Sequence, residues 1–330
     1  MNKKIRWGIL GCARIAQSAL IPAIREASNG VLWGIAARDE KRARKWAGKY
    51  KFQKFYKDYQ ALLDDPEIDA VYIPLPNHLH CEWTCRAAKA GKHILCEKPL
   101  ALNSGEVQRM IREADNAKVI LMEAFMYRFH PQIEKALKLL ASGEIGELRF
   151  FRSSFTFMYA GDEKNYRWSP QMGGGALYDV GCYTINASRL VFGEEPISVY
   201  ARAHVHPRFK VDLSTSMILE FPENRIALLD CSFDSQFQSY FEIVGREGRI
   251  TLPRSYSAKL LDVSILVLKG DELRTIAIPS INQYTRMVEH FGECVIKSQP
   301  PRYLADDSFK NMQVIDAAFE SIRTGRPVKL

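Results

Sequence analysis

The sequence has no long apolar run, no block of basic residues and no low-complexity segment. No apolar stretch approaches the ~18 residues that a membrane-spanning helix needs, and no signal peptide is predicted, so we expect no membrane partner. The 46 Lys and Arg residues against 38 Asp and Glu residues leave a net charge of +8, but the excess is spread along the chain. Such a diffuse excess is compatible with anionic small molecules and gives no reason to expect nucleic acid as a partner.

Cysteine and histidine spacings that are typical of disulfide frameworks or metal sites are also scarce. The number of cysteines, seven, is odd, and Cys81 and Cys85 are close to each other only at helical spacing. His204 and His206 lie two apart in a predicted strand, without a carboxylate or cysteine pattern near them, so no metal site is expected. This cysteine usage is typical of reduced thiols in a cytoplasmic protein. A thiol-based redox sensor is disfavoured, because no cysteine has an evident resolving partner.

The first part of the chain alternates short apolar runs with helical patterns, starting with a predicted strand over residues 5–10. The 330 residues, of which 47% are apolar and 25% charged, predict a globular protein of about two domains. Because strands that alternate with helices form parallel sheets, we expect a doubly wound α/β fold here. Residues 1–123 are therefore predicted to form a Rossmann dinucleotide-binding domain. Within it, Asp39 and Asp58 are predicted to cap the starts of two helices, and Gly91 to supply a left-handed cap at the end of another.

The pattern changes after residue 123, where strand-like segments follow one another with few helices between them. These segments lie near residues 197–204, 213–221, 225–233, 238–244 and 262–268. They predict an α+β domain over residues 124–330, with a large open sheet that is mixed or antiparallel and covered by helices on one face. The helix predicted over residues 307–324 is a candidate to pack back on the first domain.

A candidate dinucleotide-binding turn follows the first strand and reads Gly11-Cys12-Ala13-Arg14-Ile15. A strand-to-helix turn of this kind lets the backbone approach a pyrophosphate, whose charge the helix N-terminus stabilises. Gly11 meets the need for a tight turn, whereas Ala13 stands where a second glycine is usual. A plain strand-to-helix turn is the alternative interpretation. The position of the segment after the first strand favours the cofactor.

The end of the second predicted strand indicates which dinucleotide binds. Ala37 is followed by Arg38 and Asp39, and Arg42 lies one helical turn further on. Guanidinium groups at these two positions suit the 2′-phosphate of NADP, and Arg38 can also stack on adenine. A solvated basic helix start is the alternative, and Asp39 leaves NAD open. We expect NADP as the cofactor.

Four further segments read PNHLH at residues 76–80, EKPL at 97–100, EAFMYRFHP at 123–131 and GGGALYDVGCY at 173–183. In this order they resemble the signatures of the Gfo/Idh/MocA oxidoreductase family. The last two resemble most closely the branch that holds trans-dihydrodiol dehydrogenase, NADP-dependent D-xylose dehydrogenase and nucleotide-sugar 3-ketoreductases. The resemblance implies hydride transfer between nicotinamide C4 and a secondary alcohol or ketone of a sugar, a sugar derivative or a vicinal diol.

Lys98, Asp179 and Tyr183 are the candidate catalytic residues. Lys98 follows a predicted strand at its carboxyl end, where open α/β sheets bind ligands. A nearby nicotinamide cation and partial burial would lower the pKa of this lysine, which can then orient a substrate hydroxyl or stabilise an alkoxide. The resemblance implies that Tyr183 is the general acid/base, that Asp179 orients the substrate, and that the Lys98–Pro99 bond is cis. Asp179 and Tyr183 are four apart in a predicted helix and so share a face. A surface lysine and a helix-stabilising Asp–Tyr pair are the alternatives.

The resemblance adds residues around the cofactor and the substrate. Those expected near the cofactor, together with Lys98, are Leu75, Pro76, Asn77, His80, Glu97, Arg167 and Trp168. Those expected to line the substrate pocket with Lys98, Asp179 and Tyr183 are Met126, Phe155 and Tyr159. His80 also fits a helix start, Arg167 and Trp168 also fit domain packing, and the three pocket residues also fit a core.

The resulting prediction is a cytoplasmic NADP-dependent dehydrogenase or reductase that acts on CH–OH groups, with a small-molecule sugar or diol as its partner. Reduction of a 3-keto nucleotide sugar is the alternative reaction. A non-catalytic NADP-binding sensor is the alternative of another class, and retention of both Lys98 and Tyr183 disfavours it. The resemblance further implies a homodimer, or a dimer of dimers, formed through the C-terminal sheet.

Overall fold

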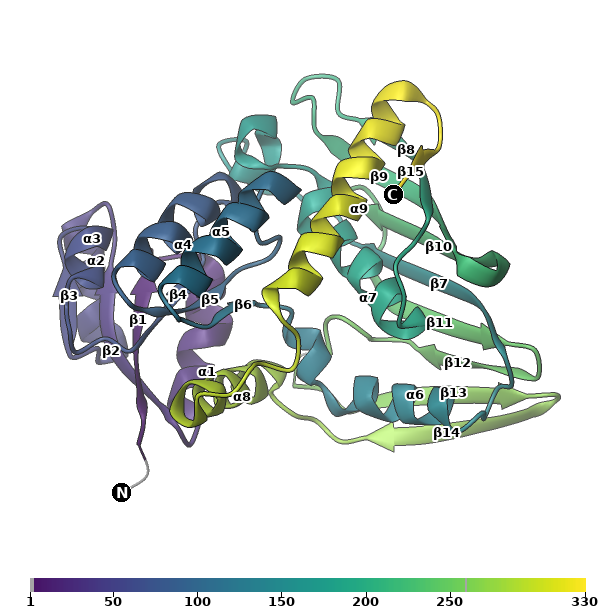
Figure 1. Ribbon diagram of the computed structural model, residues 1–330, viewed down its shortest axis with the longest axis horizontal. Helices are drawn as coiled ribbons and strands as arrows, with labels where there is room; N and C mark the ends of the chain where they lie inside the picture. The colour runs from purple at the N-terminus through teal and green to yellow at the C-terminus, as the bar shows by residue number, and fades with distance from the viewer. Residues whose placement is uncertain (1–2, 259) are drawn as a thin grey trace. The chain divides into compact units, whose positions relative to one another are not determined.

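The computed structural model describes residues 3–258 and 260–330, so that residues 1, 2 and 259 lie outside the described part of the chain. The chain forms two compact units (Figure 1). The first comprises Met1–Met126 and Asn282–Phe309, and the second comprises Tyr127–Ile281 and Lys310–Leu330. Each unit contains one sheet. The predicted α/β class, with a parallel sheet and a second, mixed sheet, is confirmed.

The first unit is built on a six-stranded parallel sheet in the order β3-β2-β1-β4-β5-β6, which is the order of a Rossmann fold. Its strands are β1 (Ile5–Leu10), β2 (Gly30–Ala36), β3 (Lys54–Tyr56), β4 (Ala70–Ile73), β5 (His93–Cys96) and β6 (Leu121–Glu123). Its helices are α1 (Ile21–Glu26), α2 (Glu40–Tyr50), α3 (Tyr59–Leu63), α4 (His80–Lys89), α5 (Ser104–Asn116) and α8 (Gln283–Lys297). All four residues of β4 are buried, as expected for a strand with both faces covered.

Side chains at the helix ends determine where α2 and α3 begin. Asp39 accepts hydrogen bonds from two backbone N–H groups in the first turn of α2, at 3.0 and 3.4 Å. Asp58 accepts one in α3, at 2.8 Å. After α4, Gly91 has a φ of +69°, a left-handed conformation that glycine adopts without steric cost. These three capping predictions are confirmed.

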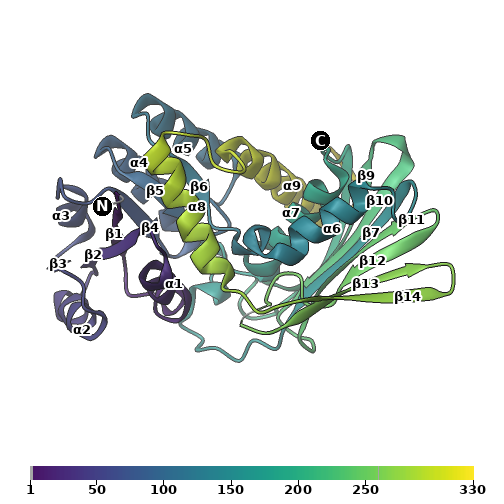
Figure 2. The ribbon, with the colours of Figure 1, turned by 90° about the horizontal axis from the view of Figure 1, so that it is seen from below.

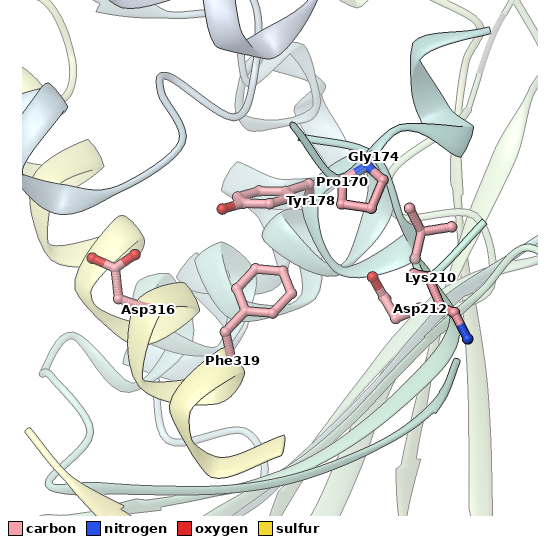
Figure 3. Close-up of a pocket in the computed structure, with 8 residues that line it drawn as sticks. Pro170, Gly174, Tyr178, Lys210, Asp212, Asp316 and Phe319 are labelled. Carbon is pink, nitrogen blue, oxygen red and sulfur yellow. The ribbon is translucent and has the colours of Figure 1, made fainter. Parts of the chain in front are cut away.

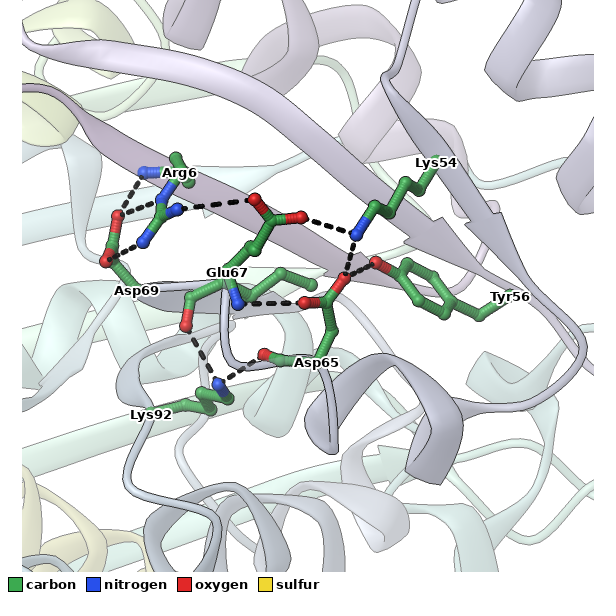
Figure 4. Close-up of polar contacts among 8 residues, drawn as sticks. Arg6, Lys54, Tyr56, Asp65, Glu67, Asp69 and Lys92 are labelled. Atoms are coloured by element: carbon green, nitrogen blue, oxygen red, sulfur yellow. Dashed lines mark hydrogen bonds and ion pairs between the residues drawn. The ribbon is translucent and has the colours of Figure 1, made fainter.

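A cluster of charged side chains joins the amino ends of three strands of the first unit (Figure 4). Arg6 of β1 binds Asp69 through two side-chain hydrogen bonds of 3.0 and 3.1 Å. Lys54 of β3 donates to Asp65 at 2.9 Å and to Glu67 at 2.6 Å. Lys92, which precedes β5, donates to two backbone carbonyls of residues 65 and 68. This cluster ties the segment before β4 to its neighbours, at the edge opposite the carboxyl ends of the strands.

The second unit is built on a nine-stranded sheet in the order β14-β13-β12-β11-β7-β10-β9-β8-β15. Only β7 and β10 pair in parallel, and the other neighbours are antiparallel. The strands are β7 (Leu148–Thr156), β8 (Ser198–Val205), β9 (Asp212–Phe221), β10 (Arg225–Ser232), β11 (Gln238–Gly245), β12 (Gly248–Leu252), β13 (Val263–Lys269), β14 (Glu272–Ile278) and β15 (Val328–Lys329). The helices are α6 (Pro131–Ala141), α7 (Cys182–Phe192) and α9 (Ala305–Thr324), of which residues 305–309 belong to the first unit.

Helices α6, α7 and α9 lie on one face of this sheet (Figure 2). Burial along β9 alternates accordingly: Met217, Leu219 and Phe221 are buried, whereas Ile218 and Glu220 are exposed. The predicted open sheet with helices on one face is therefore present. Among the helices of residues 3–258 and 260–330, none is both long and apolar enough to cross a bilayer.

The predicted helix that carries Asp179 and Tyr183 is interrupted. Residues Leu177–Gly181 form a π-helical turn, and the regular helix α7 begins only at Cys182. Gly181 lies against the sheet, since a Cβ there would approach the Cys231 sulfur to 2.9 Å. Asp179 and Tyr183 therefore do not share one regular α-helix, which corrects the i, i+4 placement expected from the sequence.

Candidate functional site

The turn after β1 has the backbone geometry that the sequence predicts. Gly11 adopts a φ of +103°, and its N–H donates to the carbonyl of Ala36 at 2.7 Å. A Cβ at this position would lie 3.0 Å from Leu75, a predicted cofactor residue that follows β4. Glycine is therefore required by both conformation and space. The chain then passes through Cys12–Ile15 into a π-helical turn, Ala16–Leu20.

The arginines after β2 are placed differently from one another. Arg42 donates from Nη2 to the carbonyl of Cys12 at 2.8 Å, so it fastens α2 to the turn after β1. Arg38 follows the buried Ala37 and is exposed. Asp39 directs one carboxylate oxygen to the backbone N–H groups of α2, as described above. Asp39, the carboxylate that kept NAD as the alternative cofactor in the sequence prediction, thus serves as a helix cap.

His80 is fully buried and connects two loops. One ring nitrogen lies 2.9 Å from the carbonyl of Pro99, and the other 2.7 Å from the carbonyl of Leu75. Burial lowers the pKa of His80 to about 4, although the two carbonyls favour the charged ring. These contacts favour the structural interpretation of His80: it holds the loop after β4 against the loop after β5. Pro76 and Asn77 lie in the first of these loops, and Asn77 is buried.

The loop that carries Lys98 is fixed by two carboxylates. Glu97 accepts a hydrogen bond from the Tyr72 hydroxyl at 2.5 Å and one from the backbone N–H of Lys98 at 3.3 Å. Glu123, at the end of β6, accepts from the N–H of Leu100 at 2.9 Å. The Lys98–Pro99 bond is cis, as the resemblance implied. The backbone on both sides of Lys98 is therefore held at the carboxyl ends of β5 and β6.

Sequence reasoning missed several tyrosines around this loop. The Tyr303 hydroxyl donates to the backbone carbonyl of Glu123 at 2.6 Å. Burial raises the pKa of Tyr284 far above its usual range; nearby Glu97 adds to this and Lys98 opposes it. Both tyrosines come from the segment 282–309, which is remote in sequence. No local motif marks them.

In the second unit, Asp179 and Arg167 form a bidentate ion pair. The guanidinium Nε and Nη2 atoms donate to the two carboxylate oxygens at 2.7 and 3.0 Å. Burial opposes the charge on Arg167, but Asp179 outweighs it and raises the pKa of the guanidinium. Two aromatic rings contact the same guanidinium: Tyr159 at 5.5 Å and Tyr166 at 5.0 Å from ring centroid to Cζ. The pairing of Arg167 with Asp179 was not predicted.

Tyr183 lies in a group of four aromatic rings. Its ring centroid is 5.3 Å from Phe155, 5.6 Å from Tyr256 and 5.9 Å from Tyr127. Its exposed fraction is 4%. Tyr127 donates to Asn186 at 2.6 Å, which fixes that ring. Tyr127 stands in one of the quoted motifs, whereas Tyr256 had no sequence signal.

Trp168 and Tyr159 meet in a second aromatic group, with ring centroids 5.2 Å apart. Trp168 also stacks on Phe209 at 5.1 Å. Met126 is buried at the end of the first unit. The predicted residues therefore form two groups, one within each unit: the loops after β1, β2, β4 and β5, and the segments that carry Phe155, Tyr159, Arg167, Trp168, Asp179 and Tyr183.

A pocket of about 360 Å³ opens elsewhere in the second unit (Figure 3). Its lining residues are Pro170, Gly174, Tyr178, Lys210, Val211, Asp212, Asp316 and Phe319. None of them is a predicted site residue. Burial raises the pKa of Asp212 to about 7, although the N–H of Leu177 and the hydroxyl of Thr215 donate to it at 2.7 and 2.9 Å. Asp212 thus holds the start of the π-helical turn.

Two family models match the chain. The model for an oxidoreductase family with an NAD-binding Rossmann fold matches residues 5–125, and the model for a GFO/IDH/MocA C-terminal domain matches residues 133–251. Together they cover most of both units.

Curated relatives and a solved structure agree with these matches. The chain is 38% identical to D-xylose 1-dehydrogenase (NADP(+)) 2 of Haloferax volcanii, over 98% of this chain and 99% of that protein. It is 32% identical to trans-1,2-dihydrobenzene-1,2-diol dehydrogenase of Xenopus laevis, over 96% and 98% of the two chains. The crystal structure of KijD10, a 3-ketoreductase from Actinomadura kijaniata in complex with NADP and TDP-benzene, superimposes with a TM-score of 0.92 at 30% identity, over 97% and 98% of the chains. The chain therefore belongs to the Gfo/Idh/MocA family of oxidoreductases.

Proposed function

We propose that this protein is an NADP-dependent oxidoreductase that interconverts a secondary alcohol and a ketone on a sugar, a sugar derivative or a vicinal diol. The observation that carries the proposal is the loop after β5. Lys98 stands at the carboxyl edge of the parallel sheet, on backbone that Glu97, Glu123 and His80 hold on both sides. The turn of Gly11 lies at the same edge, which is where open α/β sheets bind dinucleotides.

The residues of the first unit fit NADP. Gly11, with its φ of +103°, lets the backbone make the tight turn that such a phosphate-binding segment needs. Arg38 is exposed at the end of β2, and the guanidinium of Arg42 lies beside the same turn. One carboxylate oxygen of Asp39 is used as a helix cap, which makes this side chain less available to the ribose hydroxyls that would favour NAD. The residues that would hold the cofactor are Gly11, Cys12, Ala13, Arg14, Ile15, Ala37, Arg38, Arg42, Leu75, Pro76, Asn77 and Glu97.

The side chains of this chain supply orientation and proton transfer. Bound NADP supplies or accepts the hydride. The Lys98 ammonium hydrogen-bonds the reacting oxygen and stabilises negative charge on it. The Tyr183 hydroxyl exchanges the proton of that oxygen as general acid/base. Asp179, oriented by its bidentate pair with Arg167, accepts a hydrogen bond from a neighbouring substrate hydroxyl.

Steady-state kinetics of Lys98→Met and Tyr183→Phe test these roles, with xylose and other aldoses, polyols and dihydrodiols as substrates. We expect Tyr183→Phe to lower kcat by roughly 10²–10⁴-fold and Lys98→Met to abolish nearly all turnover. Binding of NADPH, measured by fluorescence titration, should persist in both variants. Lys135→Met and Tyr200→Phe, the same changes at positions outside the predicted site, are the controls. Undiminished kcat in Lys98→Met would overturn the catalytic assignment.

The same substrate screen separates the alternatives. Reduction of a 3-keto nucleotide sugar, with no oxidation of free sugars, would favour the nucleotide-sugar reaction that the name of KijD10 describes for that protein. NADP binding without turnover on any substrate would favour a sensor. We further propose that the protein is cytoplasmic, which the seven free cysteines support. We also propose that it forms a homodimer or a dimer of dimers through the second sheet.

A further inference from the structure

The pocket of the second unit is bounded by four parts of the fold (Figure 3). They are the segment of residues 170–174, the π-helical turn, the start of β9 and helix α9. All of the lining residues belong to the second unit, and the proposed oxidoreductase reaction uses none of them. A volume of about 360 Å³ lies within the range of small-molecule sites, so the pocket has room for a ligand of its own.

Asp212 supplies this pocket with a buried carboxylate that has no counter-charge. The residue is only 6% exposed. The N–H of Leu177 and the hydroxyl of Thr215 both donate to its Oδ2 atom, and both donors are neutral. The part of the chain that the structure describes places no cationic side chain in an ion pair with Asp212, and burial raises the pKa of this carboxyl to about 7. Because buried charges are normally paired, a cation that enters the pocket would stabilise the carboxylate.

An aromatic pair lies between Asp212 and a second carboxylate, Asp316. The ring centroids of Tyr178 and Phe319 are 4.8 Å apart. In the view of Figure 3, Asp212 and Asp316 stand on opposite sides of the Phe319 ring. Aromatic faces attract both cations and apolar groups. The lining therefore offers an acidic group at each end and an apolar, electron-rich surface in the middle.

Lys210 is the one cationic side chain among the lining residues of the described chain. It is exposed, and its ammonium group points away from Tyr178 and Phe319 in Figure 3. Pro170 and Val211 add only apolar surface. An anionic ligand would thus meet two carboxylates and one cation at the rim, which disfavours phosphates and carboxylic acids. Residues 3–258 and 260–330 also contain no group of three or more His, Cys, Asp or Glu side chains that could hold a metal ion, which disfavours an inorganic cation.

We propose that this pocket binds an aliphatic diamine, with one ammonium group at Asp212, the other at Asp316, and the methylene chain over the rings of Tyr178 and Phe319. An ammonium group donates up to three hydrogen bonds, and a carboxylate has about four acceptor sites, so Asp212 accepts from the ligand while it keeps its bonds to Leu177 and Thr215. The spacing of the two carboxylates selects the length of the chain.

Isothermal titration calorimetry of the full chain, without NADP or sugar, tests the proposal with unbranched diamines of three to six carbons. We expect saturable binding at one site per chain and a preference for one chain length. The monoamine n-butylamine should bind roughly 10–100-fold more weakly than the preferred diamine, because it lacks one charge-assisted hydrogen bond. Binding of no diamine, or equal affinities for the diamines and the monoamine, would overturn the proposal.

Variants of the two carboxylates locate the site. Asp316→Asn removes one charge from α9 and should weaken diamine binding roughly 10–100-fold. Asp306→Asn, at an exposed carboxylate of the same helix outside the pocket, is the matched control and should leave the affinity unchanged. Unchanged affinity in Asp316→Asn would place the diamine elsewhere and contradict the proposal.

Asp212→Asn keeps an oxygen that can accept from Leu177 and Thr215 but removes the charge, so it should weaken binding by a similar factor. If this variant fails to fold, Phe319→Leu replaces it, and the loss of the ring should lower the affinity several-fold. Full affinity in whichever of these two variants folds would also contradict the proposal. All of these measurements are made without turnover, so their outcome is independent of the proposed oxidoreductase reaction.

Discussion

The exposed guanidinium of Arg38 is the residue on which the choice of NADP over NAD depends. Because a charge-assisted contact to phosphate contributes about 1.5–3 kcal/mol, we expect Arg38→Ala to raise the KM for NADPH by roughly 10–100-fold. The KM for NADH, which lacks the 2′-phosphate, should change less than threefold by the same reasoning. Lys45→Ala, an exposed change further along α2, is the control. Equal losses with both cofactors would contradict the assignment.

In the proposed reaction Arg167 contacts Asp179 and not the reacting atoms, so it is a positioning residue. Without its guanidinium, the buried carboxylate of Asp179 loses the bidentate partner that orients it. We expect Arg167→Gln to lower kcat/KM by roughly 10–100-fold, and Arg167→Lys, which keeps the charge but not the bidentate pair, to recover part of that loss. The exposed Lys164→Gln is a control in the same segment. If Arg167→Lys recovers nothing, Arg167 has a packing role only.

Whether the role of a single residue could be predicted depends on how far away in the sequence its interaction partners lie. Gly11 and the caps Asp39 and Asp58 were found, because a turn or a helix start imposes its demand on the residue itself. The partner of Asp179 was not found, because Arg167 lies twelve positions earlier in the chain, within the first of two short 3-10 turns. His80 was placed near the cofactor by resemblance, and its contacts to two carbonyls could be read only from the folded loops.

The charged cluster at the amino ends of β1 and β3 makes the first unit sensitive to acid. Burial alone would raise the pKa of Asp65, but hydrogen bonds from Tyr56 and Lys54 lower it to about 2. Since the unfolded value is near 3.9, this carboxylate stabilises the fold above about pH 4, and the contribution is lost as the pH falls from 4 to 2. We expect Asp65→Asn to lower Tm at pH 7 and to flatten the loss of Tm between pH 4 and 2.

Thermal melting at several pH values checks this expectation, with the exposed neighbour Asp64→Asn as the control. The control should keep the pH dependence of the unaltered protein. If Asp65→Asn instead loses Tm between pH 4 and 2 as steeply as the unaltered protein, the acid sensitivity arises from other carboxylates. Asp69, whose pKa Arg6 also lowers against the effect of burial, would then be the next candidate.

Elements with a strong local pattern were predicted, and weak ones were missed. Strands β1, β2, β4 and β5 are short and mostly apolar segments and were recognised. Strand β3 has only three residues, which is too short to show an alternation of apolar and polar side chains. Strand β12 begins at Gly248, which the sequence indicates as part of a turn, so this strand was also missed. Strand β14 has five exposed residues in its seven and no alternation. The π-helical turn before α7 leaves no pattern of its own, because its residues are as apolar as those of the helix that follows.

At the level of the whole molecule, no local sequence pattern indicates that residues 282–309 return to the first unit. That the C-terminal helix packs back on the Rossmann domain stays a prediction. Helix α8 belongs to the first unit as a whole, and so do residues 305–309 of α9. The contacts that fasten α8 involve pairs more than 250 residues apart, such as Ser28 with Glu289 at 2.9 Å. Such pairs have no spacing that a single sequence displays.

The proposed dimer depends on the face of the second sheet that carries no helices of its unit (Figure 2). Ile218 and Leu228 stand opposite each other on β9 and β10 and are 40% and 38% exposed. Nine strands about 4.8 Å apart and roughly 26 Å long give a face of about 1,000 Å², and a stable interface needs about 800 Å² from each partner. The face is therefore large enough and carries apolar side chains near the centre of the sheet.

If this face joins two copies, a charge at its centre must be buried without a partner, which is strongly unfavourable. In the double variant Ile218→Glu/Leu228→Lys the two new charges would neutralise each other, so that variant would disrupt a dimer only weakly. The informative variant is therefore Ile218→Glu/Leu228→Glu, which places two like charges on the face. Sedimentation velocity should find the unaltered protein at twice or four times the mass of one chain, and this variant at a smaller mass. Leu260→Glu, at an exposed position in a turn outside the strands, should not change the mass. An unaltered protein that sediments as a single chain at micromolar concentration would contradict the dimer, and a variant that keeps the full mass would place the interface elsewhere.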